Sequence, residues 1–290
     1  MHSDSAVTQA DSTLHTREWR AQLRLDFRKR VDCTVLGRAE HIGPLRVQRP
    51  FYPEGDCCHL YILHPPGGLA PGDTLAIEAA LAPSTSVLLT TPAAGKIYCS
   101  DTQQSPQVQG VRAQLTAGSC LEWLPQETIV FSGAEVTLTN RFDLSGDADL
   151  LAWDIVVLGR RASGESFDRG QCRQHIEVYR DDCPLLIERS HFVGGSELLS
   201  APWGMQGASV AGTLVATLNA DRALLDSLRE GLATLALPGE WGISSRNGVL
   251  IARCIGDSPQ RCRQGFEWLW SQVRPLLNGR EACRPRIWNT

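Results

Sequence analysis

Residues Leu150 to Leu158 read LLAWDIVVL, an apolar run in which Asp154 is the only charged residue. Continuous apolar runs of this kind are typical of strands covered on both faces. The shorter run Ser86 to Thr90 (SVLLT) has the same character. The sequence therefore predicts buried strands inside a layered β protein.

The segments around these runs are also strand-like, but alternate polar and apolar residues. Arg20 to Phe27 (RAQLRLDF) and Glu135 to Thr139 (EVTLT) have the period of a half-buried strand. Turn signals rich in proline and glycine recur between such segments from about Glu18 to Ala220, as in Pro65 to Gly68 (PPGG). Many short strands at this spacing indicate an all-β sandwich, barrel or β-helical stack.

Two α-helices are expected in the C-terminal half. One runs from about Asp221 to Ala236, where leucines recur every three to four residues. The other follows Asp257, with Ser258 as its N-cap and Pro259 in the first helical position. No convincing linker interrupts the chain. We therefore expect a disordered tail over residues 1–16 and a single domain over residues 17–290.

The composition argues against nucleic-acid binding, secretion and a membrane span. The formal net charge of −4 and the scattered arginines argue against a nucleic-acid partner. The polar N-terminus has no apolar segment typical of a secretory signal, and no run of 18 apolar residues exists to cross a membrane. The ten cysteines form no CxxC pair. We expect a cytoplasmic protein with free thiols.

Catalytic signatures are absent from the sequence. It contains no GxSxG, HExxH or GxGxxG-then-helix pattern. Ala94-Gly95-Lys96 resembles the end of a phosphate-binding loop, but Thr90 replaces the first glycine and Ile97 replaces the magnesium-binding Ser or Thr. Nucleotide binding at this loop is therefore rejected.

Cys57 to Gly68 (CCHLYILHPPGG) contains two thiols and two imidazoles, which suggests a metal site. On a strand, however, side chains alternate between faces, and Cys58 and His64 lie about 20 Å apart. Only Cys57 and His59 are neighbours on one face. Two ligands do not close a structural metal site. The alternative is a strand with a buried thiol and a hydrogen-bonded histidine.

Several longer motifs resemble one known family when taken together and in order. They are Gly43–Gly55 (GPLRVQRPFYPEG), Cys58–Gly68 (CHLYILHPPGG), Gly72-Asp73, Thr90–Tyr98, Leu121–Ile129 (LEWLPQETI), Gly159-Arg160, Gly164-Glu165 and Arg284–Thr290 (RPRIWNT). This set resembles the urease accessory protein family UreD, called UreH in some organisms. The resemblance spans about residues 20–290.

The resemblance implies an all-β, β-helix-like or stacked-sheet scaffold with two helices and no enzymatic turnover. It implies a urease maturation factor that binds apo-urease and the accessory protein UreF. UreF in turn recruits the GTPase UreG, and together they deliver nickel to the urease active site. A polar internal tunnel is the nickel route that the resemblance implies, so nickel is expected in transit and no cofactor is expected to be tightly bound.

A transient nickel route needs ligands that hold the ion well enough to enter and loosely enough to leave. Carboxylates, water and an occasional imidazole suit it better than a cage of thiolates. The candidate residues are Asp73, Glu122, Glu127, Asp154 and, from the opening Cys-His stretch, His59.

Each candidate has a structural alternative. Asp154 is the sharpest case, because a lone carboxylate in a buried strand is costly unless it is paired or hydrated. Its alternative is an ion pair with Arg160 or Arg161. For Asp73 the alternative is a turn residue, and similar structural roles are open to the two glutamates.

Two further functions remain open at this point. One is a nickel-storing protein in which Cys57 and His59 join a complete cage. The other is a hydrolase with an unrecognised pair of carboxylates, although no motif indicates its substrate.

Overall fold

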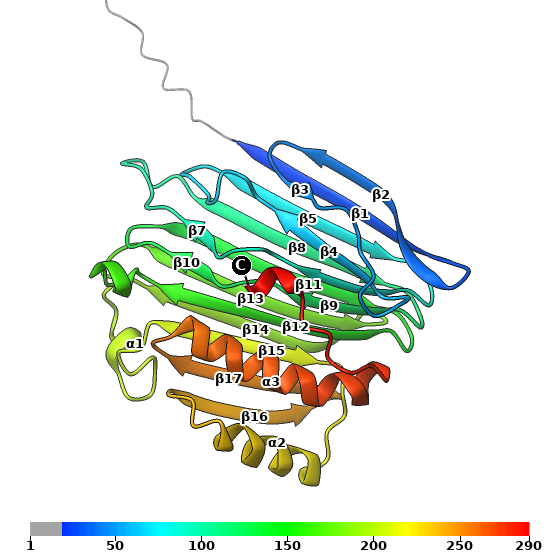
Figure 1. Ribbon diagram of the computed structural model, residues 1–290. Helices are drawn as coiled ribbons and strands as arrows, with labels where there is room; N and C mark the ends of the chain where they lie inside the picture. The colour runs from blue at the N-terminus through cyan, green and yellow to red at the C-terminus, as the bar shows by residue number, and fades with distance from the viewer. Residues whose placement is uncertain (1–18, 290) are drawn as a thin grey trace, which may run out of the picture.

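The computed structural model describes residues 19–289, which form two stacked β-sheets with helices at one end of the molecule (Figure 1). The tail expected over residues 1–16 lies outside the described residues. The mainly β fold is confirmed. Both sheets are mixed, with parallel strands at the centre and antiparallel strands at the ends.

The first sheet has seven strands in the order β14-β13-β11-β8-β5-β1-β2. Their bounds are β1 Arg20–Arg30, β2 Cys33–Ile42, β5 Thr74–Leu81, β8 Gln107–Leu115, β11 Glu135–Leu144, β13 Gln171–Arg180 and β14 Cys183–Val193. β5 and β11 alternate strictly between buried and partly buried residues, which is the pattern of a sheet with one face in the core.

The second sheet has ten strands, and its main path runs β16-β17-β15-β12-β9-β6-β4-β3. β7 and β10 extend it beside β12. The bounds are β3 Arg46–Val47, β4 Cys58–Leu63, β6 Ser86–Thr90, β7 Gly95–Ile97, β9 Cys120–Leu124, β10 Thr128–Val130, β12 Asp149–Leu158, β15 Val210–Ala216, β16 Glu240–Arg246 and β17 Val249–Gly256. β12 is the run LLAWDIVVL with the preceding Asp149, and nine of its ten residues are buried.

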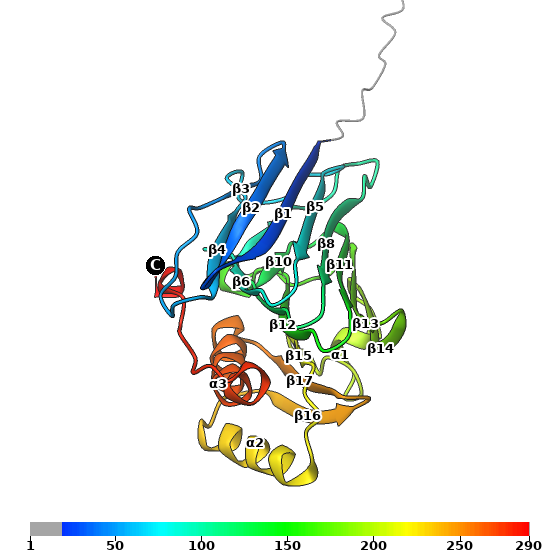
Figure 2. The same ribbon diagram turned by 90° about the vertical axis from the view of Figure 1, so that its right-hand side faces the viewer.

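The longer strands of the central body alternate between the two sheets, whereas the short strands β7 and β10 stay in the ten-stranded sheet with the strands that precede them. β4, β6, β9 and β12 are parallel neighbours in one sheet, whereas β5, β8, β11 and β13 are parallel neighbours in the other. After each of these strands the chain crosses to the opposite sheet. It then returns and pairs with the previous strand of the first sheet. Figure 2 shows the two layers from the side.

Two long helices occur where the sequence predicts them. α2 spans Arg222–Thr234, and its N-cap Asp221 accepts a hydrogen bond from the Leu224 amide. α3 spans Pro259–Asn278, and its N-cap Ser258 accepts one from the Arg261 amide. The structure adds a one-turn helix, α1 (Glu197–Ser200), and two 3-10 turns, η1 (Arg161–Ser163) and η2 (Arg286–Asn289).

The hydrophobic core has two layers, and β12 contributes to both. Its even-numbered residues Leu150, Ala152 and Val156 pack between the sheets. Its odd-numbered residues Leu151, Trp153 and Ile155 pack on the opposite side with α2 and α3. The buried strand predicted from LLAWDIVVL is thus covered on both faces.

All ten cysteines lie within the described residues and are free thiols, as expected. Among residues 19–289, no helix has both the length and the apolar character needed to cross a membrane.

Candidate functional site

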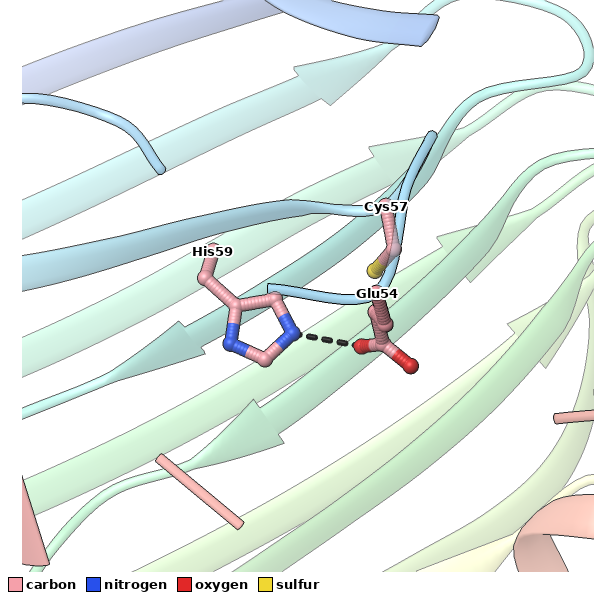
Figure 3. A group of neighbouring side chains, drawn as sticks. All are labelled: Glu54, Cys57 and His59. Atoms are coloured by element: carbon pink, nitrogen blue, oxygen red, sulfur yellow. Dashed lines mark hydrogen bonds and ion pairs between the residues drawn. The ribbon is translucent and has the colours of Figure 1, made fainter. Parts of the chain in front are cut away.

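Three side chains capable of binding a metal converge on the face of the ten-stranded sheet that α3 covers. His59 lies on β4, Cys57 directly precedes this strand, and Glu54 lies in the turn before it. Figure 3 shows the three side chains directed toward one another. Their ligand atoms all lie within 4.8 Å of one another, and His59 Nε2 is 2.5 Å from Glu54 Oε1.

The alternation expected along this strand is confirmed. Cys58, Leu60 and Ile62 pack between the sheets, whereas Cys57 belongs to the core under the helices. His59, on the same side as Cys57, is fully buried. The prediction that Cys57 and His59 are neighbours on one face of the strand is therefore confirmed. The sequence did not predict that Glu54 lies beside them.

Arg274 on α3 links Glu54 of this cluster to Glu122 on β9. Its guanidinium donates to both oxygens of Glu54, at 2.7 Å each, and to both oxygens of Glu122, at 2.9–3.1 Å. It also donates to the carbonyl of Glu281. The Trp270 indole nitrogen, one turn earlier on α3, donates to Glu122 at 2.6 Å. Arg274 is fully buried, so the network lies almost entirely away from water.

Burial and the charges of this network shift the pKa values of Glu54 and Cys57. Burial acts to raise the pKa of Glu54, but hydrogen bonds from His59 and Arg274 outweigh it and lower this pKa to about 2. Burial alone raises the pKa of the Cys57 thiol, and the nearby carboxylates of Glu122 and Glu54 raise it further. Cys57 is therefore a neutral thiol beside an ionised carboxylate.

Glu122 and Glu127, two of the predicted nickel ligands, both bind arginines of α3. Glu122 accepts from Arg274, and Glu127 accepts from Arg263 at 3.1 Å. The two residues sit at opposite ends of the LEWLPQET segment, and they hold opposite parts of the helix to the sheet. This arrangement favours their structural alternative.

Asp154 lies on the other side of the same sheet, between the two layers. Its Oδ2 accepts hydrogen bonds from Asn140 Nδ2 at 2.9 Å and from Gln174 Nε2 at 3.0 Å. Both amides come from the seven-stranded sheet. Burial raises the pKa of Asp154, and these amides oppose the shift only in part.

The structural alternative for Asp154, an ion pair with Arg160 or Arg161, is wrong. Arg160 pairs with Glu165 and Arg161 pairs with Asp257. Both arginines follow the end of β12 and lie at the surface, where they cannot reach a carboxylate between the sheets. Neutral amides satisfy Asp154 instead.

A cavity of about 140 Å³ runs between Asp154 and the partly exposed loop of residues 91–96. Two polar atoms among its lining residues, Trp123 Nε1 and Gln126 Nε2, are buried without a protein partner. The cavity is large enough to hold several waters, which can hydrate these groups. His64 lies on its wall, and burial lowers the pKa of this imidazole.

Asp73 lies in a turn, outside both the Arg274 network and the cavity beside Asp154. Its Oδ2 accepts a hydrogen bond from the Ala70 amide at 2.7 Å, which closes the turn that precedes β5. The turn alternative for Asp73 is therefore favoured. The five candidates do not form one site, because His59 and Glu122 share the Arg274 network while Asp73 and Asp154 lie outside it.

Glu54 and Arg274 are the functional candidates that the sequence analysis missed. Glu54 belongs to the motif that carries the resemblance, but its turn has no periodicity from which its direction can be predicted. Arg274 sits on the inward side of α3 between Trp270 and Leu277. A cation on the apolar face of a helix is the signal that points to buried carboxylate partners.

Comparison with known proteins agrees with these motifs. The profile of the UreD urease accessory protein family matches residues 20–289. The chain is 48% identical to the urease accessory protein UreD of Saccharophagus degradans, over 95% of this chain and 94% of the relative. It is 44% identical to UreD of Pseudomonas fluorescens and 42% identical to UreD of Citrobacter koseri, each over at least 95% of both chains. The chain therefore belongs to the UreD family of urease accessory proteins.

Proposed function

We propose that this protein is a non-catalytic scaffold in urease maturation. It binds apo-urease and UreF, UreF brings the GTPase UreG, and the assembly moves nickel toward the urease active site. Membership of the UreD family supports this role. The loop that resembles a phosphate-binding site also supports it, because Gly95 to Ile97 form strand β7 rather than the start of a helix.

The cavity beside Asp154 is the observation that carries the nickel-handling part of the proposal. It combines the buried carboxylate of Asp154 and the side-chain amide of Asn140 with room for water, and the unpartnered N–H groups of Trp123 and Gln126 can hold those waters. Such a set of oxygen ligands and waters binds a divalent cation weakly enough to release it. Nickel is the cargo of this route, so it passes the carboxylate and is not retained.

We also propose that the central body is a two-sided β-helical winding. The support is the regular alternation of parallel strands between the two sheets. In such a winding, the space between the sheets runs along the stack, and side chains such as Asp154 project into it. This geometry suits an internal route.

Partner binding has its own support at the surface. Trp203 is 70% exposed and Val31 is 87% exposed, so each presents an apolar side chain at the surface. Such residues suit surfaces that UreF or apo-urease cover in a complex. We propose a cytoplasmic location with no membrane or nucleic-acid partner, in keeping with the free thiols and the net charge of −4.

The proposal is tested by reconstituting urease from apoenzyme, UreF, UreG, GTP and nickel, with and without this chain. We expect urease activity and bound nickel to depend on the chain. Nickel content is measured after gel filtration, so that loading is separated from activity. Equal loading in the absence of the chain would overturn the proposal.

Within this assay, Asp154→Ala is expected to keep the partners bound but to lower nickel loading, since the carboxylate beside the cavity is lost. Asp154→Asn is the matched variant, because it keeps an oxygen acceptor for Asn140 and Gln174 and removes only the charge. If the charge handles nickel, both variants lower loading, and pull-down of UreF stays unchanged. Normal loading by Asp154→Asn would remove Asp154 from the route.

The alternative of a nickel-storing protein is favoured by one observation, the convergence of Glu54, Cys57 and His59. Storage requires a closed set of about four ligands that holds the ion tightly. Nickel that stays with the isolated chain through desalting and is lost in Cys57→Ala or His59→Ala would support storage. Nickel that the isolated chain binds but loses on desalting supports the scaffold, whichever of these side chains contact it.

A further inference from the structure

We propose that Glu54, Cys57 and His59 form a three-ligand binding site for one borderline divalent cation of the class Ni²⁺, Co²⁺ or Zn²⁺. The site lies on the helix-covered face of the ten-stranded sheet and is separate from the cavity at Asp154. It makes a chemical claim about the isolated chain, so it stands or fails without reference to urease maturation.

The geometry of the three side chains fits one ion. Bonds of about 2.0–2.3 Å to a tetrahedral metal place the ligand atoms roughly 3.3–3.8 Å apart. The carboxylate oxygen, thiol sulfur and imidazole nitrogen of this cluster all lie within 4.8 Å of one another. His59 Nε2 and Glu54 Oε1, now joined by a hydrogen bond of 2.5 Å, must separate by about 1 Å to admit the ion. Glu54 is the partly exposed member and can make this movement.

The donor types select the class of cation. A set of one nitrogen, one sulfur and one oxygen suits zinc, nickel or cobalt, whereas magnesium and calcium prefer oxygen ligands alone. In Figure 3 the imidazole nitrogen that faces Glu54 is the one that a metal would take. The thiol of Cys57 is directed into the same space.

Metal binding also changes the charge of the cluster. Glu54 and Glu122 share the guanidinium of Arg274, and the nearby Asp56 pairs with two cations, Arg280 and Lys29. These carboxylates and cations are balanced in number. The Cys57 thiolate that forms on binding adds a negative charge, which the divalent ion offsets.

Metal binding replaces the hydrogen bond between His59 and Glu54 by bonds to the ion, and it releases one proton. The cation takes the place of the hydrogen between His59 Nε2 and Glu54 Oε1, and that hydrogen moves to Nδ1, so the neutral imidazole becomes its Nδ1-protonated tautomer. The Cys57 thiol loses its proton to solvent when the sulfur–metal bond forms. Arg274 gives up its hydrogen bond to Glu54 Oε1 and keeps the one to Oε2, so α3 stays attached. The fourth position of the ion remains open, as in sites that exchange ligands.

The test is a titration of the purified full-length chain with Co²⁺ alone, followed by competition with Ni²⁺. The exposed thiols Cys99 and Cys183 are first replaced by serine, because they would bind metal adventitiously. We expect one equivalent of Co²⁺ to give a thiolate-to-cobalt charge-transfer band, which Ni²⁺ then displaces. A second readout is X-ray absorption of the Ni²⁺ form, with one sulfur and at least one imidazole in the first shell.

Matched variants identify the thiol. Cys57→Ser is expected to abolish the charge-transfer band, while Cys58→Ser keeps it, since Cys58 points between the sheets. Glu54→Gln and His59→Gln are each expected to raise the dissociation constant by at least the 10–100-fold that loss of an outer-shell partner causes. Circular dichroism establishes that each variant is folded.

Three results would overturn the proposal. They are the absence of a charge-transfer band in the parent chain, a band that persists in Cys57→Ser, and a nickel shell of nitrogen and oxygen without sulfur. The X-ray absorption result needs no variant, so the test remains decisive even if Cys57→Ser fails to fold.

Discussion

Replacing Arg274 with methionine is expected to lower the free energy of unfolding by about 3–5 kcal/mol, since it removes one partner of a buried charge network. Methionine fills much of the same volume but leaves Glu54 and Glu122 as ionised groups without their common partner. The Glu281 carbonyl also loses its donor. The measurement is urea denaturation followed by circular dichroism.

Two controls separate this effect from general damage to α3. Arg284→Met removes an arginine that is 42% exposed and pairs with Glu267, so we expect a loss of only about 0–1 kcal/mol. The triple variant Arg274→Met, Glu54→Gln, Glu122→Gln is expected to recover part of the stability, because the stranded charges are gone. A loss for Arg274→Met no larger than that for Arg284→Met would show that the network does not fasten the helix.

The second large effect is expected at Trp153. Replacing it with alanine should cost about 3–5 kcal/mol, because a fully buried indole leaves a cavity between β12 and α3. Its ring stacks on Phe266 and packs against Trp288, and its nitrogen donates to the Pro125 carbonyl at 2.7 Å. Thermal and urea unfolding measure the change.

Trp203 offers a matched control for this substitution. Its side chain is 70% exposed, so Trp203→Ala is expected to change stability by no more than about 0.5 kcal/mol. Trp153→Phe keeps an aromatic ring and loses only the nitrogen and part of the volume, so its cost should fall between the two. Equal effects at Trp153 and Trp203 would contradict the packing of β12 against α3.

Much of the fold follows from periodicity. The apolar run at Leu150 predicts a strand buried on both faces, and the leucine spacing and Ser258-Pro259 predict the two long helices. Which strands pair does not follow, because parallel partners lie in segments separated by a strand of the other sheet. The short helix α1 has too few residues to show a period.

The candidate site was only half predictable for a related reason. Alternation along one strand places Cys57 and His59 together, since both belong to one local element. Glu54 lies in a turn and Arg274 on a distant helix, and no local rule connects either to His59. Asp154 was recognised as unusual from its apolar neighbours, but its amide partners come from two strands of the opposite sheet.

The Arg274 network has a consequence for the order in which the molecule is made. Glu54 and Arg274 are 220 residues apart, and Glu122 and Arg274 are 152 apart. On the ribosome, the turn that carries Glu54 and the strand that carries Glu122 emerge long before the helix that neutralises them. Throughout that interval, the outer face of the ten-stranded sheet is uncovered, with two charges among apolar side chains. Folding of this face is therefore completed only when α3 arrives, and nascent chains without it expose apolar side chains that favour aggregation.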